Sequence, residues 1–393
     1  MKKPRISLRL PKGRDIYIQI AMILLGIIGF FMIISASMTT NTSAQTLGLV
    51  AARQFAFLLL GYIGYIVFAR TFDILWFKRN IIPLGAILFL SLWVPLFFPA
   101  VNGAQAWIQL PGGMTLQPSE FAKLGVVILM AVYMGDVRGR NIRLAELIQF
   151  PFYYIGATIL LIILIQNDMG TGVALFIMVV FEFLMAGHKK LVPMQITVVV
   201  LIILTVVFSF LVLSPAGIYF VKNVLNLPTY MVSRFENTIN PFINRFGSGY
   251  QLVNGLVAFV KGGWTGVGFG RSLQKYGYLP AAKTDYILAV LAEEFGFLGV
   301  AVVVVLYFML IFRLLKHALN AKNEKTRMIL VGIAMYLFSH FMLNVGGVTA
   351  LIPLTGVPLL LLSSGGSSTL SIMLGLGIAQ ALIVKQHREG IET

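Results

Sequence analysis

Carboxylates are scarce in this chain, which holds only fourteen aspartates and glutamates in 393 residues. Half of them fall in the Lys- and Arg-rich segments that are expected on the cytoplasmic side of the membrane. Glu182 lies toward the cytoplasmic end of its predicted helix. The remaining six lie at or near the other side: Glu120, Asp168, Glu236, Asp285, Glu293 and Glu294. A carboxylate in such a place could act as a general base, taking a proton from a substrate hydroxyl.

Asp285 stands where a basic loop meets an apolar helix, shortly after Pro280 and Thr284. Taken alone, it is better explained as a helix cap or as an acid favoured in a first helical turn. Glu293 and Glu294 lie two turns deeper, where a carboxylate is costly and therefore a candidate for function. Adjacent helical residues point about 100° apart, so at most one of the two is expected to face a given cavity.

Three further polar groups fall at the outer side. Glu120 and Lys123 are spaced three residues apart, so they can pair on one helix face, either as a buried ion pair or as part of a site. Asp168 occupies a tight turn, where it either caps the next helix or touches substrate. Ser367 belongs to the polar run 363–368, which predicts a close helix approach or a lined cavity within the last span.

The elements that carry these residues are predicted to be membrane helices. The chain is 58% hydrophobic and 11% charged, with a mean hydropathy of +0.89, and it repeats apolar runs long enough to cross a bilayer. We predict an all-α integral membrane protein with one polytopic domain over residues 1–393. About ten transmembrane helices are expected near 16–37, 52–70, 80–98, 118–135, 149–166, 169–187, 191–213, 285–312, 327–347 and 355–384.

Basic residues set the orientation of these helices. The loops at 38–51 and 99–117 contain no Lys or Arg, whereas the alternate loops are basic. By the positive-inside rule the tails 1–15 and 385–393 are cytoplasmic, and 214–284 forms a large extracellular loop between the seventh and eighth helices. These basic loops explain the net charge of +16 without nucleic acid. With no Cys and four His, a zinc site is not expected.

The loop 214–284 is itself strongly basic, with seven Lys and Arg against Glu236 as its one acid. Its cations, Lys222, Arg234, Arg245, Lys261, Arg271, Lys275 and Lys283, could meet anionic lipid headgroups or a phosphate-bearing substrate. Charge alone favours neither. The glycine-rich stretch 262–270 lacks the context of a phosphate loop, so close backbone packing is the better interpretation.

Several segments together resemble the shape, elongation, division and sporulation family of bacterial peptidoglycan polymerases. The similarity rests on 117–123 (Gln-Pro-Ser-Glu-Phe-Ala-Lys), 166–171, 249–251, 262–270, 278–296 and 353–368, which follow the family order along most of the chain. The segment 272–280 is closer to the division branch than to the elongation branch. Ala281, Lys283 and Ser364 depart from the usual family pattern.

The resemblance implies a glycosyltransferase that polymerises lipid II on the outer face of the bacterial cytoplasmic membrane, releasing undecaprenyl pyrophosphate. It assigns Asp285 the role of general base on the acceptor hydroxyl. Lys283, Arg234 and Arg245 are then expected to bind pyrophosphate; the sequence requires no cofactor, and a Mg or Mn ion is an optional helper. Glu120, Lys123, Glu293 and Ser367 are expected to bind substrate.

The family works with class B penicillin-binding protein transpeptidases and with other division or elongation proteins, so such partners and a septal location are expected. Three alternatives stay open at this point: an elongation-type polymerase of the same family, a lipid II flippase or transporter, and a non-catalytic scaffold. Against transport, the polar groups concentrate at the outer end and the sequence shows no convincing inverted repeat.

Overall fold

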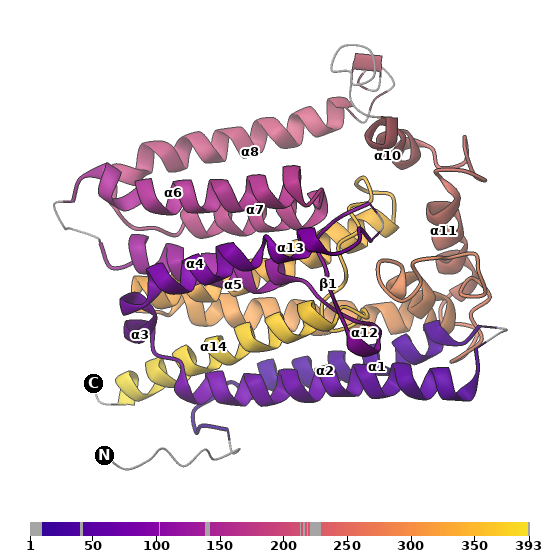
Figure 1. Cartoon of the computed structure of the whole chain (residues 1–393), viewed down its shortest axis with the longest axis horizontal. Coiled ribbons are helices and arrows are strands. Elements are labelled where there is room, and N and C mark those ends of the chain that lie inside the picture. Colours follow the sequence, from indigo (N-terminus) through magenta and orange to yellow (C-terminus); the bar gives the residue numbers. More distant parts are fainter. Residues whose placement is uncertain are drawn as a thin grey trace.

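The structure is a computed structural model that describes residues 10–39, 42–101, 103–137, 142–212, 214, 217, 219–220 and 229–391. The first nine residues of the basic tail lie outside these ranges, as do Arg138, Arg140 and Lys222. The helices run side by side with both termini at one end, and α10 and α11 cover the other (Figure 1).

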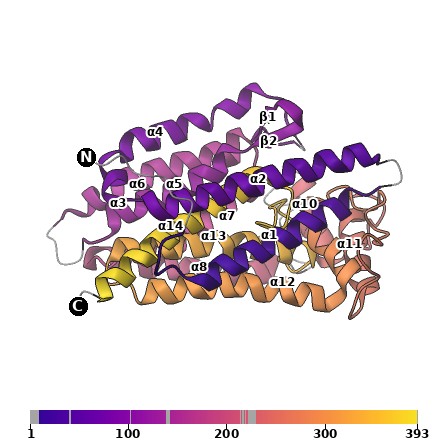
Figure 2. The ribbon, with the colours of Figure 1, turned by 90° about the horizontal axis from the view of Figure 1, so that it is seen from below.

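The α-helices differ in length, and the long ones run the length of the bundle. In chain order they are α1 (Ile16–Ser37), α2 (Ala44–Thr71), α3 (Ile74–Arg79), α4 (Ile81–Ser91), α5 (Pro118–Met134), α6 (Leu144–Leu160), α7 (Met169–Phe183), α8 (Val192–Val212), α10 (Thr229–Ile239), α11 (Tyr250–Gly262), α12 (Ile287–Leu319), α13 (Glu324–Val348) and α14 (Gly366–Ile391). A short antiparallel hairpin, β1 (Ile108–Leu110) and β2 (Met114–Leu116), lies beyond the end of α4 (Figure 2).

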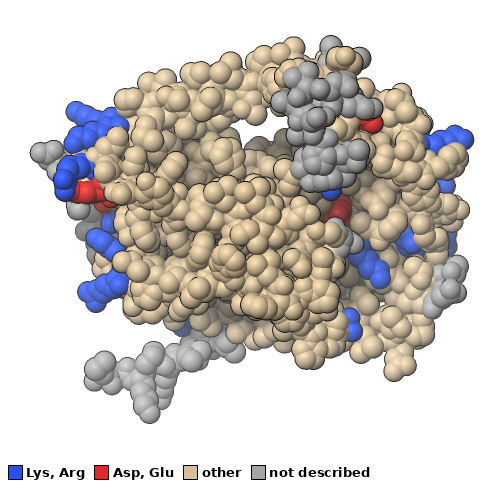
Figure 3. All heavy atoms as spheres, turned by 45° about the horizontal axis from the view of Figure 1, so that its top comes forward, with Lys and Arg blue, Asp and Glu red and all other residues tan. Residues whose placement is uncertain are grey.

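The predicted membrane architecture is confirmed. In the described residues seven helices are long and apolar enough to cross a bilayer, and shorter apolar helices cover Ile81–Phe97 and Met169–Phe183. The remaining predicted span, the fourth in chain order, is α5, whose 17 residues include Glu120 and Lys123. Lys and Arg gather at the two ends of the molecule, with a broad uncharged belt between them (Figure 3).

Several predicted boundaries were wrong. The second span begins at Ala44 rather than near 52, and the fifth span, α6, begins at Leu144 rather than near 149. The last span begins at Gly366 rather than near 355, because residues 351–365 form an irregular segment. Within that segment, residues 359–362 are fully buried, so the chain turns back into the bundle before α14 starts.

Glycines let α2 and α14 approach each other closely. A Cβ at Gly61 would meet the side chain of Met373, and one at Gly377 would meet the backbone of Tyr65. Small residues at such crossings allow the backbones of membrane helices to pack together. By contrast, α8 stands at the edge of the bundle with its apolar side chains almost wholly exposed.

The eighth span is not one continuous helix. Gly296 has φ +65° and ψ −164° inside α12, and the backbone of Thr265 and Gly266 fills the space where its Cβ would lie. The N–H groups of Phe297 and Leu298 donate to the carbonyls of Gly263 and Trp264 at 2.8 and 3.1 Å. The glycine-rich stretch therefore packs against the break in α12, which confirms the packing interpretation.

The cytoplasmic end of the bundle is tied together at Asp15. Its carboxylate caps α1 through Tyr17 N–H and accepts from Arg313 at 2.5 Å and from His317 at 2.7 Å. Gln380 exchanges two hydrogen bonds with the Asp15 backbone. Burial would raise the pKa of Asp15, but the His317, Arg313 and Ile18 N–H donors outweigh it and hold the pKa well below its usual range.

Candidate active site

Asp285 lies just before α12 at the outer end of the bundle, and its backbone is fixed by polar neighbours. Asn344 on α13 donates to the Asp285 carbonyl at 2.9 Å. At the two residues before Asp285, Ser363 Oγ donates to Thr284 O at 2.7 Å, and Ser364 N–H donates to Lys283 O at 2.9 Å. The irregular segment before α14 therefore fixes the backbone of residues 283–285, which carries the Asp285 carboxylate.

The side chain of Asp285 does not cap the helix. The N-cap position of α12 is Tyr286, and no side chain accepts a capping hydrogen bond there. The explanation favoured for Asp285 in isolation is thus wrong, because the helix starts two residues beyond it. The half-buried carboxylate is left available for chemistry.

The surroundings tune this carboxylate toward the role of a base. Burial raises the pKa of Asp285 to about 6, and the Thr284 hydroxyl and the positive charge of Arg234 offset this only in part. The negative charge of Asp168 adds to the rise. A carboxyl with this pKa is largely ionised at neutral pH, yet it accepts a proton more readily than an ordinary aspartate.

Asp168 is bonded on both carboxylate oxygens. One oxygen caps α7 by accepting from Thr171 N–H at 3.1 Å, and the other accepts from the Gln117 side-chain amide at 2.8 Å. Burial raises the pKa of Asp168, while the Thr171 donors pull it down. The predicted cap is confirmed, and the electrostatic interaction with Asp285 also places Asp168 at the candidate site.

Glu120 and Lys123 form the predicted ion pair. Lys123 Nζ lies 2.8 Å from Glu120 Oε1, and both side chains are fully buried in α5. Lys123 Nζ is also 2.7 Å from His340 Nε2 and lies over the ring of Tyr336, whose hydroxyl donates to Glu120. A buried pair with several further partners is the form in which such charges are tolerated inside a protein.

Ser367 lies in the first turn of α14, where it contacts the chain that leads into α5. Its hydroxyl accepts from Gln117 N–H at 2.8 Å and donates to Thr115 O at 3.2 Å. Ser371, one turn later, donates to Glu120 O at 2.7 Å. The predicted substrate residue Ser367 therefore joins the β2 end of the hairpin to α5 and α14.

Glu293 and Glu294 are both bound by the outer loop, through different groups. Glu293 accepts from Ser272 Oγ and from the N–H groups of Leu273 and Gln274, at 2.5–3.1 Å. Glu294 pairs with Lys275 at 3.0 Å. Both acids sit on the turn before the break at Gly296, so the loop segment 272–275 wraps over the two carboxylates together. Eight residues separate Glu293 from Asp285, which is about 12 Å along a helix.

The predicted cations differ in how they are placed. Arg234 on α10 is exposed, and its charge reaches Asp285. Lys283 is exposed two residues before Asp285, and the exposed Arg245 guanidinium lies 4.6 Å from the centre of the Phe246 ring. Lys275 is fully buried against Glu294, so this loop cation serves the fold.

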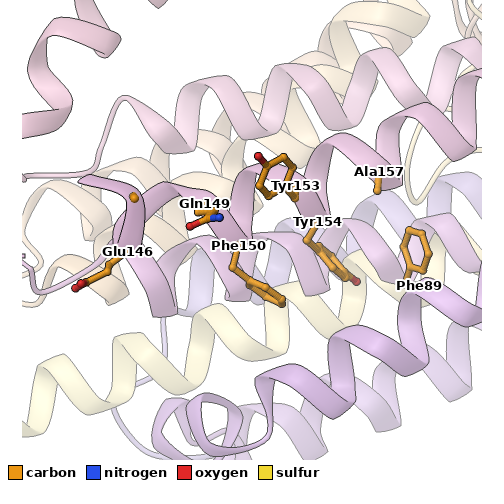
Figure 4. Close-up of a pocket in the computed structure, with 8 residues that line it drawn as sticks. Phe89, Glu146, Gln149, Phe150, Tyr153, Tyr154 and Ala157 are labelled. Carbon is orange, nitrogen blue, oxygen red and sulfur yellow. The ribbon is translucent and has the colours of Figure 1, made fainter. Parts of the chain in front are cut away.

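A groove lies elsewhere in the bundle. It has a volume of about 600 Å³ and is lined by α6 side chains from Ala145 to Ala157 together with Phe89 on α4 (Figure 4). These residues lie in the half of the bundle that begins at the cytoplasmic end, away from Asp285. Across the described ranges no three His, Asp or Glu side chains come together as metal ligands.

With this geometry in view, the family model named cell cycle protein, which covers FtsW, RodA and SpoVE, matches residues 15–388. The chain belongs to this family. The FtsW, RodA and SpoVE family is the shape, elongation, division and sporulation family that the sequence motifs indicated, so that resemblance is confirmed.

Members of the family resemble the chain over most of its length. A protein named "Probable peptidoglycan glycosyltransferase FtsW" from Trichlorobacter lovleyi is 33% identical, covering 83% of this chain and 81% of its own. Stage V sporulation protein E of Bacillus subtilis is 32% identical, covering 93% and 95%.

Solved structures share the fold. A chain in a structure titled "Structural coordination of polymerization and crosslinking by a peptidoglycan synthase complex" superposes with a TM-score of 0.72 at 24% identity, covering 96% of this chain and 100% of its own. The rod shape determining protein RodA of Thermus thermophilus superposes with a TM-score of 0.60 at 24% identity, covering 95% and 97%.

Sequence reasoning missed the neutral residues that assemble this family site. Asn344, Gln117, His340 and Tyr336 each bridge two elements, yet none stands out by charge or spacing. His340 and Asn344 are four residues apart on an apolar helix, so a buried polar pair on one face was the available signal.

Proposed function

We propose that this chain polymerises lipid II into β-1,4 glycan strands at the outer face of the cytoplasmic membrane, with Asp285 as the general base. The chain is a multi-pass membrane enzyme of the peptidoglycan glycosyltransferase class, the activity that its relatives carry in their names. The observation that supports the base is a half-buried, non-capping carboxylate whose pKa is raised to about 6.

In this proposal Asp285 takes the proton from the 4-hydroxyl of the acceptor sugar. The electron pair left on the acceptor 4-oxygen attacks the anomeric carbon of the donor and forms the new glycosidic bond with inversion. The bond to undecaprenyl pyrophosphate breaks, and its electrons leave with the pyrophosphate. A well-placed general base contributes about 10²–10⁴-fold to such a reaction.

The leaving pyrophosphate needs positive charge, and the outer loop provides it. Arg234 and Lys283 lie exposed near Asp285, and Arg245 is exposed on the same loop. Their charges would stabilise the negative charge that develops on the leaving group. If a Mg or Mn ion takes part, Asp285 is the carboxylate that would meet it, with Asp168 as its acidic neighbour, because the negative charge of Asp168 adds to the raised pKa of Asp285 and a cation would relieve it.

The buried groups behind Asp285 would complete the substrate cavity. Glu120, Lys123 and Ser367 are joined to Asp168 through Gln117, so they would hold the wall of the site rather than meet the pyrophosphate directly. Glu293 would act from further away, by fixing the loop 272–275. A class B penicillin-binding protein as partner and a septal location belong to the same proposal.

The test is a product assay with purified protein and fluorescent lipid II, with and without a class B penicillin-binding protein. We expect long glycan chains that lysozyme digests. Lipid II that crosses a liposome bilayer without forming polymer would instead establish transport. Equal polymer formation by the class B penicillin-binding protein without this chain would contradict the proposal that this chain is the polymerase.

A further inference from the structure

His340 joins the two charged parts of the site from within α13. Its Nε2 lies 2.7 Å from Lys123 Nζ, and its Nδ1 lies 3.0 Å from Pro358 O in the segment before α14. The imidazole is fully buried. It is therefore a bridge between α5 and the irregular segment, and burial makes both hydrogen bonds necessary to satisfy the ring.

The two partners fix the protonation state of the ring. A carbonyl oxygen can only accept, so Nδ1 must carry the proton that it donates to Pro358. The ammonium of Lys123, paired with Glu120, can only donate, so Nε2 must accept. Both contacts are satisfied by one state alone, the neutral imidazole with its proton on Nδ1.

The segment that His340 holds is also the one that reaches Asp285. Asn344, one turn further along α13, donates both to Val357 O and to Asp285 O at 2.9 Å. A Cβ built on Gly356 would lie 3.8 Å from Asp285 Oδ2. One face of α13 thus fixes residues 356–358 beside the carboxylate and the ammonium of Lys123 behind it.

We propose that His340 is a positioning residue for glycosyl transfer: as a neutral Nδ1–H imidazole it orients the Lys123 ammonium and anchors Pro358, and so sets the geometry between the Glu120–Lys123 pair and Asp285. This inference rests on the proposed function. The connection runs onward through Asp168, whose carboxyl feels the charges of Lys123 and Glu120 and in turn acts on Asp285.

The first test compares lipid II polymerisation by His340→Gln, His340→Leu and the control Ser339→Ala. Ser339 is equally buried on the same helix, but its hydroxyl bonds only within α13, to Tyr336 O. Glutamine can accept from Lys123 and donate to Pro358, whereas leucine can do neither. We expect kcat to fall about tenfold or more in the leucine variant with KM little changed, and to recover most of its value in the glutamine variant. Equal losses in both variants would overturn the inference.

The second test needs no activity, so it separates this inference from the proposed function. The chain has only four histidines, and nitrogen NMR of ¹⁵N-histidine protein distinguishes the two neutral tautomers from the imidazolium. We expect at neutral pH one Nδ1–H imidazole signal that disappears in His340→Gln. An Nε2–H tautomer or a charged ring at His340 would refute it, whether or not the protein polymerises lipid II. The same Nδ1–H signal is expected in Asp285→Asn, because Lys123 and Pro358 set the tautomer, and its loss there would also refute the inference.

Discussion

The general-base role proposed for Asp285 rests on the backbone contacts that place it and on its burial, since its carboxylate forms no ion pair within the described part of the chain. Asn344, Ser363 and Ser364 fix residues 283–285, so the carboxylate projects ahead of α12 without capping it. The surrounding protein removes water from it and raises its pKa to about 6. Proximity to Arg234 keeps the ionised form accessible at neutral pH.

The rate of polymerisation is expected to depend on pH through this carboxyl. Because the base must be ionised, kcat/KM should rise with pH and level off above an apparent pKa of about 6. Arg234→Ala removes a charge that favours the ionised form, so the acid limb should move to higher pH. A pH–rate profile of both proteins measures this, and a limb that moves to lower pH would contradict the assignment.

The same pKa makes a prediction about stability. A carboxyl whose folded pKa lies above its unfolded value takes up protons on folding, so its contribution to stability is present at low pH and lost as the pH rises through about 6. Asp285→Asn should therefore unfold at a higher temperature than the native protein at pH 7, and the difference should shrink at pH 5. Thermal unfolding in detergent measures it, with Glu236→Gln as control; a lower Tm for Asp285→Asn at pH 7 would refute it.

At this scale the sequence could supply candidates but not their roles. Counting acids reduced the search to six, and the i, i+3 spacing predicted the Glu120–Lys123 pair correctly. The capping interpretation of Asp285 failed because the start of α12 depends on contacts with residues 363–364, which are distant in the chain. The spacing of His340 and Asn344 could have marked a polar face on an apolar helix, but their partners Lys123, Pro358 and Asp285 are distant in the sequence and are revealed only in three dimensions.

Among the elements, α12 depends most on one residue. Gly296 adopts φ +65°, and the backbone of residues 264–266 occupies the place of a side chain. Gly296→Ala should therefore destabilise the protein by about 1–3 kcal/mol, through backbone strain and the loss of close packing. Thermal unfolding compares it with Gly156→Ala in α6, where an added Cβ would meet no atom within 4 Å. Equal losses of unfolding free energy in the two variants would show that the break at Gly296 tolerates a side chain as well as an ordinary helical position does.

The cytoplasmic tie at Asp15 gives a second prediction for the elements. Asp15→Ala removes the cap of α1 and leaves Arg313 without its carboxylate, so unfolding should become easier by about 2–4 kcal/mol. Because the folded pKa of Asp15 is depressed, its contribution is present above its ordinary pKa and is lost as the pH falls toward the folded value. A native-like Tm for Asp15→Ala at pH 7 would contradict this.

Helices were predicted better than the chain between them. Apolar runs placed ten spans, since crossing a bilayer imposes both length and composition. Residues 355–365 were assigned to the last helix, yet they form an irregular segment in which residues 359–363 are buried. Hydropathy cannot separate these cases, because both bury the same side chains away from water.

For the whole molecule, the charge distribution fixes orientation. Both termini lie at one end, Arg234, Arg245 and Lys283 lie at the other, and an apolar belt separates them (Figures 1 and 3). The chain lacks cysteine, so single cysteines can be introduced without background labelling. A membrane-impermeant maleimide should label exposed Lys261→Cys in intact cells and exposed Lys322→Cys only after permeabilisation. The reverse pattern would contradict the topology.

The central claim is that Asp285 takes the acceptor proton, and the initial rate of lipid II polymerisation by Asp285→Asn tests it most directly. The variant keeps the size of the side chain and is expected to stay folded, but it cannot accept the proton. With the same partner and substrate concentrations as the native protein, we predict a loss of about 10²–10⁴-fold, while Glu236→Gln stays near the native rate. A folded Asp285→Asn protein that polymerises within about threefold of the native rate would contradict the account.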